Sequence, residues 1–222
     1  MSEGVDGQIV SKQRVADHGE VFTGRREVEA MLELVQHETE RIDSRFLEPA
    51  CGTGNFLAEI LTRKLRAVET RYRQSQHDYE RNAVLAISSI YGIDILRDSI
   101  EECRQLLFSI FDREYSRLFG DRAQDKCRRA VQFILRRNII HGDALSLTTI
   151  DAPTRPIVFS EWSPVNGSLL KRRDYTFRGL LASSARKEPS LMSDFGQGVF
   201  LPAPAREFAP IHFLEVDQLG DS

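Results

Sequence analysis

The stretch Leu47–Phe56, LEPACGTGNF, constrains the fold more than any other part of the chain. It joins a short apolar run to an acid, a proline and two glycines one residue apart, and an amphipathic run follows. Because glycine has no side chain, Gly52 and Gly54 allow positive φ and the close approach of a ligand to the backbone. A helix that begins after Gly54 would offer free N–H groups to an anion or a carboxylate. The glycines alone suit a ligand-binding turn and a purely structural turn equally well.

Runs that suit strands alternate with runs that suit helices along the chain. We expect strands at 44–47, 87–94, 138–143 and 155–162, and helices after Thr23 and at 56–65, 98–118 and 122–136. The first helix would have Thr23 as its N-cap and an apolar stripe made of Val28, Met31, Leu32 and Val35. The polar residues 69–82 suit either a helical hairpin or an insertion. This alternation predicts an α/β fold, with a mostly parallel twisted sheet and helices on both faces.

Length and charge set broad limits on the class of protein. The chain has 222 residues, of which 41% are hydrophobic, enough for one domain with a sizeable core and a small second unit. We expect a mobile tail at 1–20, the main domain at 21–165 and an irregular extension at 166–222. The formal net charge of -3 gives no basic signature for nucleic acid, although a local basic patch stays open.

The cysteines and the apolar runs indicate the compartment. Cys51, Cys103 and Cys127 have no metal-ligand spacing, and three cysteines cannot all pair with one another. A reducing compartment is the simplest interpretation, and no metal is expected. The sequence contains neither an apolar run of about 18 residues nor a signal-peptide pattern, so we expect a soluble, cytoplasmic protein.

Acidic residues stand where the expected strands end. Parallel sheets bind ligands beyond the carboxyl ends of their strands, which directs attention to Glu48, Asp94 and Asp143. An acid at the position of Asp94 can accept hydrogen bonds from ribose hydroxyls. Leu57 occupies the position of the third glycine of GxGxxG, so a nucleoside ligand is favoured over a dinucleotide. In the alternative interpretation, Asp94 caps a helix and Asp143 ends a strand in a turn.

EPACGTGNF resembles motif I of S-adenosylmethionine-dependent amino-methyltransferases, especially the N6-adenine DNA methyltransferases of restriction–modification systems. Residues 21–32, VFTGRREVEAML, resemble motif X of that family, with Gly24 in place of a proline. Asp94 and Asp143 match the acids of motifs II and III. The motif order is that of the γ arrangement, and the resemblance covers about residues 20–165. It implies a Rossmann-like class I methyltransferase fold.

The resemblance also implies a set of cofactor-binding residues. Glu48 and the amides of the turn would hold the amino and carboxylate groups of the methionine part. Asp94 would bind the ribose, and Asp143 the adenine amine. The full set comprises Phe22, Thr23, Glu48, Pro49, Ala50, Cys51, Gly52, Gly54, Asn55, Phe56, Asp94, Ile95, Asp143 and Ala144.

The expected catalytic motif departs from the family pattern. In the family, Asn, Asp or Ser is followed by two prolines and an aromatic residue, whereas residues 160–167 read SEWSPVNG. Val165 and Asn166 replace the second proline and the aromatic residue. Trp162 would stack the target base and Glu161 would accept from its amine, or else Trp162 is core and Glu161 pairs with a nearby cation. The catalytic candidates are Glu161, Trp162, Ser163 and Pro164.

A basic and aromatic run, LLKRRDYTFR, occupies residues 169–178. It suits either contact with nucleic acid or an ordinary solvated face, and its candidates are Lys171, Arg172, Arg173 and Tyr175. Little sequence follows for a target-recognition domain, so specificity would come from a partner subunit or a homodimer, or would be absent. The expected function is methylation of adenine N6 in DNA. The alternatives are a non-catalytic scaffold that binds the cofactor, and methylation of RNA or protein.

Overall fold

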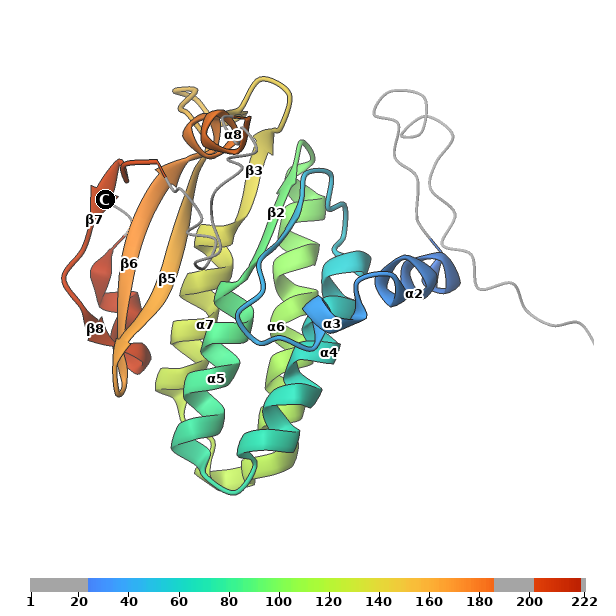
Figure 1. Ribbon diagram of the computed structural model, residues 1–222, viewed down its shortest axis with the longest axis vertical. Coiled ribbons are helices and arrows are strands. Elements are labelled where there is room, and N and C mark those ends of the chain that lie inside the picture. The colour runs from blue at the N-terminus through green and yellow to red at the C-terminus, as the bar shows by residue number, and fades with distance from the viewer. Residues whose placement is uncertain (1–23, 186–201, 221–222) are drawn as a thin grey trace, which may run out of the picture.

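Two β-sheets share one helical layer in the computed structural model, which describes residues 24–185 and 202–220 (Figure 1). The first sheet has the strand order β1 (Phe46–Glu48), β2 (Ile90–Asp94), β3 (Ile139–Asp143) and β4 (Thr148–Thr149). Strands β1, β2 and β3 are parallel, and β4 is antiparallel to β3. The second sheet is antiparallel and contains β5 (Val158–Asn166), β6 (Leu169–Thr176), β7 (Arg206–Glu207) and β8 (Ile211–His212). The mixed α/β class is confirmed, whereas parallel pairing is limited to β1–β3.

The helices of the described residues pack mainly on one face of the first sheet, and α8 lies apart from the others (Figure 1). They are α2 (Arg25–Glu33), α3 (Gln36–Thr39), α4 (Asn55–Tyr72), α5 (Gln76–Ser88), α6 (Arg97–Phe119), α7 (Asp125–Asn138) and α8 (Phe177–Ala185), with 3-10 helices η1 (Gly120–Arg122) and η2 (Phe213–Leu219). In α4 the apolar residues Leu57, Ile60, Leu61 and Leu65 recur at helical spacing and are buried. Helices α4 and α5 run in opposite directions side by side, so residues 69–82 form a helical hairpin.

A buried lysine fixes the segment that leads into β1. Lys64 of α4 is fully buried, and its ammonium donates hydrogen bonds to the carbonyl oxygens of Arg41, Ile42 and Ser44 at 2.9, 3.0 and 2.6 Å. An ammonium carries three donors, so these three carbonyls satisfy it completely. The start of β1 is thereby held against the middle of α4.

The two faces of the parallel strands are covered differently. Ile90 and Ile139 pack into the helical core, whereas Tyr91 and Ile93 pack with Phe159 and other residues on the opposite side. This alternation follows from the period of two along a strand. Within the described residues, the β5–β6 hairpin and the single helix α8 cover the second face. The prediction of helices on both faces is therefore met only in part.

Several boundaries differ from the sequence-based expectation. Helix α5 continues to Ser88, so β2 begins at Ile90 rather than near residue 87. Helix α2 has Gly24 as its N-cap, with the Gly24 N–H donating to a Glu27 carboxylate oxygen at 2.9 Å, and Thr23 lies outside the described residues. Regular structure also continues past residue 165, where β6 and α8 take the place of an irregular extension.

Candidate functional site

The glycine turn between β1 and α4 has the backbone that its sequence predicts. Gly52 and Gly54 both adopt positive φ, +51° and +92°. A Cβ on Gly54 would lie 2.5 Å from Cys103 Sγ, so this position needs glycine for space as well as for conformation. A Cβ on Gly52 would meet nothing within 4 Å, so the backbone there faces open space that a ligand can occupy.

Asp94 connects this turn to the end of β2. One carboxylate oxygen accepts from the Gly52 N–H at 2.8 Å, and the other accepts from the Leu96 N–H at 2.9 Å, just before α6. The Cys51 N–H also donates to the Ile93 carbonyl oxygen at 2.9 Å. Asp94 therefore has a structural role at the start of α6. Each carboxylate oxygen keeps further acceptor capacity for a ligand hydroxyl.

Glu48 is the last residue of β1 and is half-buried. Burial raises the pKa of Glu48 above its ordinary value, and the Ala50 N–H, 3.4 Å from a carboxylate oxygen, opposes this shift. A desolvated carboxylate with one long hydrogen bond would gain from a cationic partner. Glu48 thus has the chemistry to hold an ammonium group at the turn.

Asp143 ends β3 in a tight turn. Its carboxylate accepts from the Leu145 N–H at 2.8 Å, and this bond, with help from Ser146, lowers the pKa of Asp143. The turn interpretation of this acid therefore holds. Since β1, β2 and β3 are parallel neighbours, the structure still brings Glu48, Asp94 and Asp143 to one edge of the sheet.

Other predicted cofactor residues within the described part of the chain lie around this edge. Pro49 and Ala50 are exposed in the turn, Asn55 and Phe56 begin α4, and Ile95 is exposed after β2. Ala144 packs partly against the core on the second face of the sheet. Phe22 and Thr23 lie outside the described residues.

The β5–β6 hairpin extends to the opposite end of the sheet (Figure 1). At its turn, Arg81 of α5 donates to the Gly167 carbonyl oxygen at 3.3 Å, and His77 Nε2 hydrogen-bonds to Ser168 Oγ at 2.7 Å. Helix α5 begins at this end and leads towards the start of β2. The hairpin turn is therefore remote from the carboxyl ends of β1–β3.

The predicted catalytic residues do not come together with the cofactor residues. Ser163 and Pro164 lie on the half of β5 next to the hairpin turn, opposite Lys171 and Leu170 of β6. Trp162 is buried and packs edge-to-face on Phe133 of α7, with ring centroids 6.2 Å apart. Trp162 is therefore a core residue, as one of the two interpretations of the sequence expected. Its ring has no exposed face on which a base could stack.

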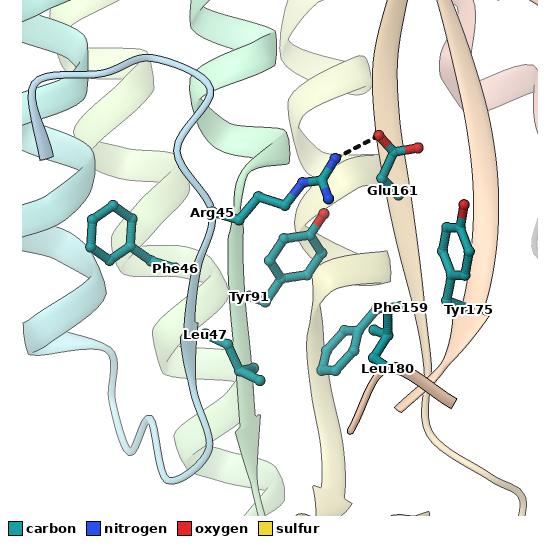
Figure 2. Close-up of a pocket in the computed structure, with 8 residues that line it drawn as sticks. All are labelled: Arg45, Phe46, Leu47, Tyr91, Phe159, Glu161, Tyr175 and Leu180. Carbon is teal, nitrogen blue, oxygen red and sulfur yellow. Dashed lines mark hydrogen bonds and ion pairs between the residues drawn. The ribbon is translucent and has the colours of Figure 1, made fainter. Parts of the chain in front are cut away.

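Glu161 closes one end of a small apolar cavity (Figure 2). It accepts from Arg45 at 2.7 Å and from Arg173 at 3.4 Å. The cavity has a volume of about 170 Å³ and is lined by Arg45, Phe46, Leu47, Tyr91, Phe159, Glu161, Tyr175 and Leu180. Sequence reasoning identified only Glu161 and Tyr175 among these. The cavity could not be found from local spacing, since its wall combines two sheets and α8.

The predicted nucleic-acid residues are mostly paired or buried. Arg172 is fully buried and binds both carboxylate oxygens of Asp174 at 2.8 Å. Lys171 and Arg173 both form ion pairs with Glu207, at 2.7 and 3.5 Å. Tyr175 is buried against the cavity. These residues do not form an open basic patch.

The fold and its acidic edge define an α/β domain of the kind that binds a ligand beyond the carboxyl ends of parallel strands. The family model of the MmeI DNA-methyltransferase domain matches residues 23–152, more than half of the 222 residues. The chain belongs to this family. The match ends before β5, so the hairpin lies outside it. No curated protein matches the chain, and no solved structure matches it.

In residues 24–185 and 202–220, no helix is both long and apolar enough to cross a membrane. Over the same residues, His, Cys, Asp and Glu side chains form no cluster of three or more that could hold a metal ion.

Proposed function

We propose that this chain binds S-adenosylmethionine at the acidic edge and takes part in methylating adenine N6 in DNA, within a restriction–modification system. Membership of the MmeI DNA-methyltransferase domain family supports the general activity. The observation that carries the cofactor assignment is the 2.8 Å hydrogen bond from the Gly52 N–H to Asp94, which joins the glycine turn to the end of the next strand. Two of the three segments that would touch the cofactor are thereby fixed to each other.

The donors and acceptors at this edge fit the groups of the cofactor. The methionine ammonium would donate to Glu48, which burial has left with a single long hydrogen bond. The open space over Gly52 leaves room for a carboxylate near the N–H groups of the turn and of α4. Ribose hydroxyls would donate to Asp94, and the adenine amine to Asp143. The bound cofactor would supply the methyl group as an electrophilic sulfonium.

Transfer to adenine N6 sets a further requirement. The amine is a weak nucleophile, so acceptors must orient its lone pair in line with the methyl group. In duplex DNA the base must also leave the helical stack. Ser163 and Pro164 lie towards the other end of the sheet, and Glu161 is already paired with Arg45. The target base would therefore have to bind near the acidic edge, next to Glu48 and the exposed β1 residue Leu47.

The position of the hairpin favours a second candidate function. The chain would bind the cofactor without transferring the methyl group, as a scaffold or regulatory subunit. The separation of Ser163 from the turn and the replacement of the family residues at Val165 and Asn166 both support this alternative.

A methyl-transfer assay distinguishes the two functions. The protein is incubated with cofactor carrying a radiolabelled methyl group and with mixed DNA, using RNA as the control substrate. Label recovered on adenine N6 of the DNA is the expected result. Measurable cofactor binding with no label on DNA would support the scaffold, and label on RNA alone would overturn the choice of substrate.

A further inference from the structure

His141 lies on the helix-covered face of β3, beside two of the acids at the sheet edge. Its register partner in β2 is Asp94, and Asp143 follows two residues later on the same strand. Because side chains alternate along a strand, all three side chains lie on one face of the sheet. The His141 side chain is 13% exposed, and the proposed methyl transfer gives it no role.

Both nitrogen atoms of the His141 ring face acceptor groups. Nε2 lies 3.0 Å from the Ile95 carbonyl oxygen. Since a carbonyl oxygen only accepts, Nε2 must carry the hydrogen of this bond. Nδ1 is buried without a hydrogen-bond partner in the described residues, although an Asp151 carboxylate oxygen is 3.4 Å away, within ion-pair distance. Arg97 also pairs with Asp151, so the ring has a fixed neighbour on each side.

The bond from His141 acts on a peptide group that also holds Asp94. The Ile95 carbonyl and the Leu96 N–H belong to one planar peptide group, so they turn together. His141 binds the carbonyl of this peptide, and the N–H of the same peptide donates to an Asp94 carboxylate oxygen at 2.9 Å. A rotation of this peptide would therefore break both bonds and release one oxygen of Asp94.

We propose that His141 is a positioning residue for Asp94. Through the peptide between Ile95 and Leu96, it fixes the direction of the carboxylate that would accept from the ribose. The other Asp94 oxygen accepts from the Gly52 N–H at 2.8 Å, so the peptide that His141 holds completes a clamp on both oxygens. The effect on the cofactor rests on the proposed function, whereas the clamp itself does not.

Two substitutions separate the roles of the two ring nitrogens. The side-chain amide of His141→Gln reaches the position of Nε2 and keeps a donor for the Ile95 carbonyl, whereas that of His141→Asn reaches only the position of Nδ1. We expect the affinity of His141→Gln for S-adenosylhomocysteine to stay within about threefold of wild type, and that of His141→Asn to be at least about tenfold weaker, as measured by calorimetry. His37→Asn, at an exposed histidine of α3, is the matched control and should bind like wild type.

Two measurements by nuclear magnetic resonance test the clamp on the full chain without a ligand. In wild-type protein labelled with a nitrogen isotope, the His141 Nε2 signal should be that of a nitrogen that carries hydrogen. Hydrogen exchange of the Leu96 amide should be at least about tenfold faster in His141→Asn than in wild type, and close to wild type in His141→Gln.

The measurements separate the possible failures. A wild-type His141 Nε2 without hydrogen, or equal exchange of the Leu96 amide in His141→Asn and wild type, would overturn the clamp. Faster exchange with unchanged affinity would overturn the effect on the cofactor site, and so would equal losses of affinity in both His141 variants. If wild-type protein binds no S-adenosylhomocysteine, the proposed function fails, while the resonance measurements still decide on the clamp. The wild-type Nε2 signal keeps the test valid even if His141→Asn does not fold.

Discussion

Asp94 has a structural role in the fold and, in the proposed function, a second role in binding the ribose of the cofactor. Its carboxylate accepts from the Gly52 N–H and from the Leu96 N–H, so it orders the glycine turn and the approach to α6. Both loops are thus ordered before a ribose binds, which reduces the entropic cost of binding. The structural and the cofactor-binding interpretations of Asp94 are therefore compatible.

Replacing Asp94 with asparagine tests its role in binding. Asp94→Asn removes the charge and leaves one carbonyl oxygen for two N–H groups and the ligand. We expect the affinity for S-adenosylhomocysteine to fall by about 1.5–3 kcal/mol, roughly tenfold to a hundredfold in Kd, as measured by calorimetry. Asp121→Asn, at an exposed residue of η1, is the matched control and should have no effect. Equal affinities for Asp94→Asn and wild type would show that Asp94 does not bind the ribose.

We expect Glu48 to make binding of the proposed cofactor depend on pH, in a direction that follows from the burial of its carboxyl group. Burial raises the pKa of Glu48, so the carboxylate becomes protonated at a higher pH than an ordinary glutamate of about 4.3. A neutral Glu48 cannot pair with the ligand ammonium. Affinity for S-adenosylhomocysteine should therefore decrease as pH falls towards this range, and the decrease should begin above the ordinary glutamate pKa. In Glu48→Gln we expect weaker binding without this pH dependence, whereas Glu59→Gln on α4 should behave like wild type. A wild-type affinity that stays constant through this range would remove Glu48 from the site.

Among the elements, β1 is the shortest part of the candidate site and depends on its neighbours. It pairs with β2 alone within the described residues, and Lys64 of α4 holds the carbonyl groups that precede it. The turn after β1 is tied to β2 by the Cys51 N–H and by Asp94. A substitution in α4 that removes these hydrogen bonds should therefore displace β1 and, through it, the proposed cofactor site.

Lys64→Met tests this support. The methionine side chain has a similar length but removes one donor from each of three carbonyl oxygens, of which that of Ile42 keeps the Ser89 hydroxyl at 3.3 Å. We expect the free energy of unfolding to fall by about 1.5–3 kcal/mol in denaturant titrations. Lys126→Met is the matched control, because the Lys126 ammonium forms a long, exposed ion pair with Glu215 at 3.8 Å, so its effect should stay below about 1 kcal/mol. Similar losses for both variants would show that Lys64 does not support β1.

Over the whole molecule, the sequence predicted the features that depend on residues close together in the chain. It did not predict the features that depend on contacts between segments far apart in the chain. The strand, the glycine turn and the following helix form one continuous segment, and its pattern predicted both the turn and Asp94 at the next strand end. The β5–β6 hairpin depends on pairing across Gly167, and its place on the second face depends on Tyr91 and Phe159. One local signal of this hairpin was present in the sequence. Arg172 and Asp174 are two residues apart, so on a strand their side chains point to the same face, where they form a buried ion pair.

The molecule has two parts that differ in their relation to the family. The edge of the first sheet carries the proposed cofactor contacts, and the β5–β6 hairpin lies outside the family match. The chain belongs to the MmeI DNA-methyltransferase domain family through the first part. The hairpin contributes a buried Arg172–Asp174 pair and the wall of an apolar cavity. Cofactor binding should therefore affect the edge and leave the hairpin turn unchanged.

Hydrogen–deuterium exchange with and without S-adenosylhomocysteine tests this central claim most directly. The ligand should slow exchange of backbone amides in the three strand-end segments, residues 48–57, 94–97 and 143–146. Exchange at the β5–β6 turn, residues 164–170, should not change, which provides an internal control. Protection confined to the hairpin, or no protection in any of the three segments at saturating ligand, would contradict the account.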